Sequence, residues 1–120
     1  MHADIARIEN SLLDELASTM ETISAIDVQI RDSVDSCEWD AARHLAIRLV
    51  DFLTERRISS EDLRRKLIGL AETHSKHAIQ IQRCSDISTH VVNVVSKYLP
   101  VYQRIVSGLD ERRTAAAPPS

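Results

Sequence analysis

The sequence contains few of the residues that interrupt or cross-link a chain. Its 120 residues include two glycines, three prolines and two cysteines, and only 3% are aromatic. Glycine-rich phosphate loops and the Gly-x-Ser-x-Gly elbow of hydrolases are absent. Cys37 and Cys84 are too few for a disulfide framework and lack the Cys-x-x-Cys spacing of a zinc site. A core with so few aromatics must consist of Leu, Ile, Val and Ala, the usual filling of helical bundles.

Long hydrophobic runs and an excess of basic charge are also missing. No stretch of eighteen apolar residues is present, and no basic segment followed by an apolar one begins at Met1, so we expect a cytoplasmic protein without a membrane span or secretory signal. The formal net charge of −3 repels polyanions, and we expect no nucleic-acid partner. At 43% apolar and 28% charged residues, the composition is typical of one globular domain.

Apolar residues spaced three and four apart run along nearly the whole chain. Such spacing is typical of helices that pack on other helices. A first stripe predicts a helix over residues 3–34, and Asp35 followed by Glu38 resembles a capping box that begins a second helix. We expect that second helix to end near Arg57 and a turn at Ile58 and Ser59. An unbroken stripe then predicts a third long helix, with these seam positions: Leu63, Leu67, Leu70, His74, His77, Ile81, Cys84, Ser88, Val91, Val95, Tyr98, Tyr102, Ile105 and Leu109.

Pro100 is the one expected interruption of the third helix. Proline removes a backbone donor and crowds the carbonyl four residues earlier, which predicts a kink or an end there. Residues 101–109 then form a short fourth helix, hinged to the body. The predicted fold class is all-α, an antiparallel helical bundle of three long helices plus a short C-terminal helix. Residues 1–112 form the single domain, and residues 113–120, rich in Ala and Pro, a disordered tail.

Histidines supply the only candidates for chemistry. His74 and His77 share one helical face and can bind one metal ion if His44 or Cys84 adds a ligand, but Cys84 lies about 10 Å from His77 along a helix. A hydrogen-bonded polar layer that fixes the bundle's register is the plainer interpretation. The same histidines beside Lys76 resemble a histidine phosphotransfer site without the small residues that follow its lysine. We therefore predict no metal site, no cofactor and no enzyme activity.

One stretch of the third helix is apolar around much of its circumference. It is either buried in the bundle on two sides, or it is a docking groove that the last segment covers until a partner's amphipathic helix displaces it. In the second interpretation, residues 101–109 swing about Pro100 and act as a lid. The predicted partner-binding residues are Val91, Val94, Val95, Tyr98, Val101, Tyr102 and Ile105.

The segment Asp35-Ser36-Cys37-Glu38-Trp39-Asp40 between two long helices resembles small flagellar export chaperones of the FliT and FlgN type. Those proteins have a helix, an acidic turn, a Trp-Asp pair that opens a second helix, and a long third helix. The resemblance implies a cytosolic type III export chaperone that holds the amphipathic helix of a secreted subunit and delivers it to the export machinery. The alternative is a self-associating structural bundle, for example a homodimer.

Overall fold

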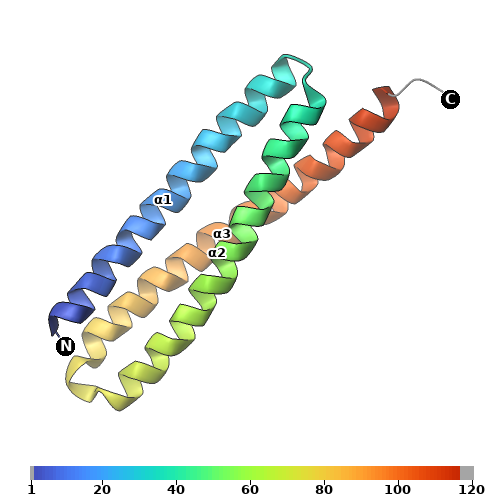
Figure 1. Ribbon diagram of the computed structural model, residues 1–120. Helices are drawn as coiled ribbons and strands as arrows, with labels where there is room; N and C mark the ends of the chain where they lie inside the picture. Colours follow the sequence, from blue (N-terminus) through green and yellow to red (C-terminus); the bar gives the residue numbers. More distant parts are fainter. Residues whose placement is uncertain (1, 117–120) are drawn as a thin grey trace.

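Three long helices make up almost all of the computed structural model, which describes the backbone of residues 2–116 and the side chains of residues 3–112. The helices are α1 (His2–Asp35), α2 (Trp39–Thr73) and α3 (Ala78–Ala116), and a 3-10 turn, η1 (Ser75–His77), joins the last two (Figure 1). They run up, down and up in a rod of 68 × 21 × 15 Å. No strand occurs within residues 2–116, so the predicted all-helical fold is confirmed for that part of the chain.

The first reversal falls where the sequence predicts it. Cys37 has φ 58°, the left-handed conformation that ends many helices, and the Glu38 N–H donates to the Ser33 carbonyl at 2.8 Å. The Cys37 N–H donates to the Val34 carbonyl at 3.0 Å and completes a Schellman motif. The predicted capping box does not form, because the Glu38 side chain caps nothing at the start of α2. Backbone geometry rather than a side-chain cap makes this turn.

The second reversal lies about fifteen residues later than predicted. Helix α2 continues through Ile58 and Ser59, where the Ser59 hydroxyl donates to the Arg56 carbonyl within the helix, 3.2 Å away. The chain turns instead at His74–His77, which interrupts the stripe that the sequence predicts to be unbroken. A 3-10 turn nearly preserves the three-residue spacing, so the spacing of the seam positions alone does not reveal the break. The signal that was available is the absence of any strongly apolar residue from 72 to 77.

Pro100 does not end or hinge α3. The helix continues through it to Ala116, so the predicted short C-terminal helix is not a separate element of residues 2–116. Side chains beyond the proline hold this part on the bundle: Tyr102 and Leu109 are buried, and Asp110 forms an ion pair with Arg43 of α2. The exposed proline forfeits one hydrogen bond while the packing on both sides keeps the helix going. Residues 117–120 of the predicted tail lie outside the described residues.

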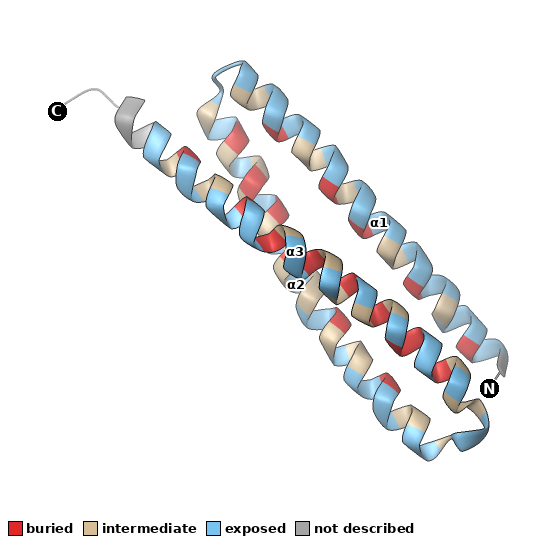
Figure 2. Ribbon diagram, turned by 180° about the vertical axis from the view of Figure 1, so that it is seen from behind, coloured by how far each residue is buried: buried red, intermediate tan, exposed pale blue. Residues whose placement is uncertain are grey.

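The core is divided into two apolar clusters along the rod. The larger cluster contains Ile23, Ile30, Ala42, Ala46, Leu49, Leu53, Val91, Val95, Leu99, Tyr102 and Leu109. The smaller one, near the α2–α3 turn, contains Ile5, Leu12, Leu67, Ile81 and Cys84. The larger cluster draws mainly on α2 and α3, and the smaller one contains two residues of α1, one of α2 and two of α3. Helix α1 adds buried residues at wide intervals only, as its scattered red positions in Figure 2 show.

Candidate functional site

The seven predicted partner-binding residues do not form an open groove. Val91 and Val95 are fully buried, Tyr102 is 3% exposed, and the core cluster contains all three. Val94, Tyr98 and Ile105 are half-buried against the same cluster, and only Val101 is exposed, at 41%. The breadth of the apolar stretch on α3 therefore reflects burial on two sides, against α1 and against α2.

The cover of this surface is α1 and not residues 101–109. A segment that continues the same helix cannot fold back over Val91, and α3 is one continuous helix. On the other side of the cluster, Ile23 and Ile30 of α1 complete the core. The lid that the sequence predicts is thus replaced by a whole helix from the other end of the chain.

A hydrogen bond ties α1 to α3 at the upper end of this surface. The Tyr102 hydroxyl donates to Asp27 Oδ1 at 2.8 Å, and Asp27 also pairs with Arg31 at 2.8 Å. Burial, and then the hydrogen bond to Asp27, raise the pKa of Tyr102 above its ordinary value near 10. The phenol is therefore held in its protonated, donating form at every physiological pH.

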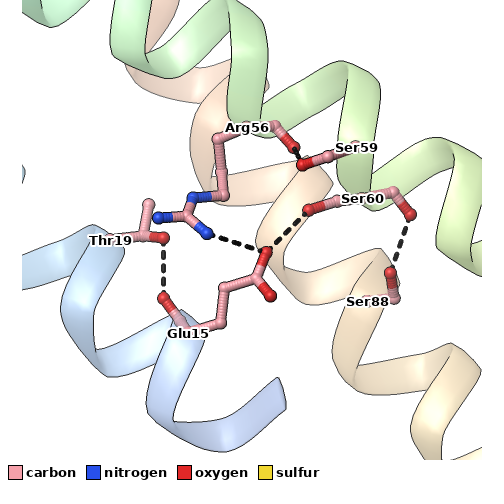
Figure 3. A network of polar contacts seen from close by, with 6 residues as sticks. All are labelled: Glu15, Thr19, Arg56, Ser59, Ser60 and Ser88. Atoms are coloured by element: carbon pink, nitrogen blue, oxygen red, sulfur yellow. Dashed lines mark hydrogen bonds and ion pairs between the residues drawn. The ribbon is translucent and has the colours of Figure 1, made fainter. Parts of the chain in front are cut away.

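A polar network joins all three helices midway along the rod (Figure 3). Arg56 of α2 forms an ion pair with Glu15 of α1 at 3.1 Å, and the Ser60 hydroxyl donates to the same carboxylate at 3.3 Å. The Ser88 hydroxyl of α3 donates to the Ser60 carbonyl at 2.8 Å, and the Thr19 hydroxyl donates to the Glu15 carbonyl at 2.7 Å. Such a layer satisfies its polar groups only when the helices meet in one register.

This network corrects the predicted polar layer, which was placed on His74 and His77. Ser88 occupies a seam position in the sequence and was the one available signal. Its partner Ser60 lies on α2, and Glu15, which accepts from Ser60, lies on α1, so spacing along α3 could not reveal them. A buried serine on an apolar seam is thus the sequence feature that indicates the network.

The histidines lie at the turn between α2 and α3. His74 ends α2, His77 belongs to η1, and His77 Nδ1 lies 3.3 Å from Gln80 Oε1, so the helix that would align the two rings is interrupted. His44 is exposed on α2, and Cys84 is fully buried with its Sγ 3.9 Å from the Ile5 carbonyl oxygen. Burial, and then Glu9, raise the pKa of the Cys84 thiol. Within the described residues, no group of three His, Cys, Asp or Glu side chains is placed to bind a metal ion.

The three helices differ in charge. Helix α1 has eight acidic and two basic residues, a formal charge of −6. Helices α2 and α3 together have nine acidic and twelve basic residues, a formal charge of +3. Helix α1 also makes far fewer contacts with either neighbour than α2 and α3 make with each other. Electrostatic attraction therefore contributes to holding a helix that apolar packing holds only in part.

Comparisons with known proteins give no relative: no family model, no curated protein and no solved structure matches the chain. None of the three described helices has an apolar stretch long enough to cross a membrane. The function of the bundle must therefore be argued from its own geometry.

Proposed function

We propose that the chain is a small helix-binding protein, with the role of an export chaperone, that holds an amphipathic helix of a secreted subunit in the place that α1 occupies. It would act in the cytoplasm, on a protein partner and without a cofactor. The observation that carries this proposal is the uneven packing of the bundle. Helices α2 and α3 form a closely packed hairpin, and α1 lies on it as the less firmly attached third helix.

Release of α1 exposes an apolar surface that suits a guest helix. Val91, Val95 and Tyr102 would lose their cover, together with the half-buried Val94, Tyr98 and Ile105. This mechanism is an exchange of an intramolecular helix for an intermolecular one. It keeps the predicted binding residues and replaces the predicted lid, residues 101–109, by α1.

Helix α1 indicates what the guest should look like. Its buried positions Ile5, Leu12, Thr19, Ile23 and Ile30 follow a heptad pattern. Its Glu15 meets Arg56 and its Asp27 meets Tyr102. A guest helix is therefore expected to be about seven turns long, to be acidic, and to carry apolar residues seven apart. Because α1 is tethered, it competes at an effective concentration in the millimolar range, which keeps the surface closed until such a guest arrives.

A peptide of residues 3–34 tests the exchange, since it has the expected guest pattern. We expect a fluorescent form of this peptide to bind Ile23→Ala protein at least tenfold more tightly than wild-type protein in an anisotropy titration. The reason is that loss of the buried Ile23 side chain weakens docking of the resident α1 by about 2–4 kcal/mol.

Two control variants separate the alternatives. Gln29→Ala, an exposed change on α1, should bind the peptide as the wild type does, and so should Pro100→Ala, which stiffens the position of the former lid. Equal affinity for wild-type and Ile23→Ala protein would reject exchange of α1. Tighter binding of the peptide to the Pro100→Ala protein alone would support the original interpretation, in which residues 101–109 act as the lid.

A further inference from the structure

Basic residues form an exposed row along η1 and α3. Lys76, Arg83, His90, Lys97 and Arg104 are spaced seven residues apart, and all five are exposed. Residues seven apart in an α-helix lie on one face, within about 20° per step. The row therefore spans four seven-residue steps, about eight helical turns, along one side of the rod. Next to it runs a row of apolar side chains: Ile87, Val94 and Val101.

Helix α1 carries a matching row of opposite charge. Asp14, Glu21 and Asp35 are exposed and lie in one heptad row, which begins at Arg7 and includes Val28. Beside this row, Leu13 and Met20 expose 47% and 54% of their surface, and within the row Val28 exposes 56%. These apolar side chains point away from the core that the other face of α1 completes. Nothing in the polar network or the core uses them.

Lys76 and Arg83 of the basic row line the groove between α1 and α3. Asp14 and Glu21 each follow Leu13 or Met20 by one residue, about 100° further round the helix, so the acidic row lies at the outer edge of α1. At the lower end, Ala6 and Glu9 of α1 lie across a groove of about 390 Å³ from Lys76 and Arg83. Leu13 and Met20 follow Ala6 at seven-residue steps, and His90 and Lys97 follow Arg83 in the same way. The α1–α3 face thus has an acidic edge on α1, an apolar middle and a basic edge on α3.

We propose that this α1–α3 face is a homodimer interface, occupied by the same face of a second copy related by a twofold axis parallel to the helices. That rotation brings the acidic edge of each copy against the basic edge of the other, so the face is complementary to itself. A twofold axis across the helices would instead bring acid against acid. The charge pattern therefore selects a parallel dimer, with both α1–α2 turns at one end.

The register of the two rows supports the same arrangement. Helices α1 and α3 run in the same direction (Figure 1), and the contacts Cys84–Ile5 and Tyr102–Asp27 join residues 79 and 75 apart in sequence. Glu21 and Lys97 are 76 apart, so they lie at the same height on the rod. A rotation about a parallel axis preserves height, and Glu21 of one copy faces Lys97 of the other. The acidic row also argues against an anionic membrane or nucleic acid as the occupant.

Charge reversal tests the interface, with sedimentation velocity of the full chain over a concentration series as the measurement. We expect the wild type to dimerise, and Glu21→Lys and Lys97→Glu each to raise the dimer dissociation constant at least tenfold. An equimolar mixture of the two variants should recover the wild-type dimer, because each contact then pairs opposite charges. Asp51→Lys, an exposed change on α2, is the matched control and should dimerise normally. A wild type that stays monomeric, or a mixture that does not recover, overturns the proposal.

Spin labels on Cys37 test the direction of packing. Cys37 is exposed in the α1–α2 turn and Cys84 is buried, so labelling is selective for Cys37. In the parallel dimer the two labels lie at one end, separated by no more than about two molecular widths of 21 Å, within range of dipolar spectroscopy. A distance close to the 68 Å length of the rod would show antiparallel packing and overturn the proposed arrangement.

Discussion

Helix α1 and the α2–α3 hairpin are attached to the bundle in different ways. The hairpin is joined by a short turn, and its Ala42, Ala46, Leu49 and Leu53 are completely buried in the larger core cluster. Helix α1 buries fewer side chains and is also fastened by polar contacts, of Glu15 with Arg56 and Ser60 and of Asp27 with Tyr102. Apolar packing thus stabilises the α2–α3 hairpin. The attachment of α1 depends on apolar packing together with polar contacts and charge. A bundle built in this way suits the proposed exchange of α1.

The largest expected effect comes from the hairpin core. Leu49→Ala removes a fully buried side chain, and we expect it to lower the free energy of unfolding by about 2–5 kcal/mol in urea denaturation. Leu12→Ala, at a buried position of α1, makes the same chemical change in the other part. It should mainly free α1, so that the most protected amides of α2 and α3 change little in hydrogen exchange. Equal loss of protection in all helices for both variants would show that the two parts unfold as one.

The next effect concerns the polar network. Glu15→Gln removes the negative charge of the ion pair between Glu15 of α1 and Arg56 of α2. We expect the free energy of unfolding to fall by about 1–2 kcal/mol. Asp51→Asn, an exposed change on α2, is the control and should stay within about 0.5 kcal/mol of the wild type. Thermal or urea denaturation followed by circular dichroism measures both. If the Glu15→Gln variant is as stable as the wild type, the network fixes the register of the helices without adding to stability.

A smaller effect is expected from the hydrogen bond between α3 and α1. Tyr102→Phe removes the donor to Asp27, and we expect a loss of about 0.5–1.5 kcal/mol at pH 7. Because the pKa of Tyr102 is raised in the folded protein, folding favours the protonated phenol. This stabilisation is complete below about pH 10 and is lost as the pH rises above the unfolded value.

Urea denaturation from pH 8 to 11.5 checks the sign of this pH dependence. The gap in stability between wild type and Tyr102→Phe should narrow above pH 10. A gap that stays constant would mean that Tyr102 ionises as readily in the folded protein as in the unfolded chain, and a gap that widens would mean that it ionises more readily in the folded protein.

The fold class and α1 were predictable, and the second reversal was not. An apolar stripe without Gly or Pro over residues 3–34 leaves little alternative to a helix. Ser59 and Ser60 have the composition of a helix start, yet Ser60 is buried in the polar network and Ser59 bonds within the helix. The hydroxyl of a serine can form hydrogen bonds both at a helix start and within a helix, so tertiary contacts decide which of the two occurs.

The residues of the candidate site could be predicted from the sequence, but the helix that covers them could not. The stretch around Val91 to Ile105 is apolar on two sides because two helices pack on it, one of the two interpretations that its sequence allows. Pro100 suggested a hinge, but Tyr102, Leu109 and the Arg43–Asp110 ion pair hold both sides of the proline on the bundle. Which helix covers the stretch depends on the path of the chain, and spacing along one helix carries no information about that path.

Native-state hydrogen exchange, resolved by residue, tests the central claim that α1 is the exchangeable helix. We predict that the slowest amides of α1 exchange at least tenfold faster than the slowest amides of α2 and α3, an opening free energy lower by about 1.4 kcal/mol or more. Equal protection in all three helices would contradict the claim, because α1 would then leave the bundle only when the whole protein unfolds.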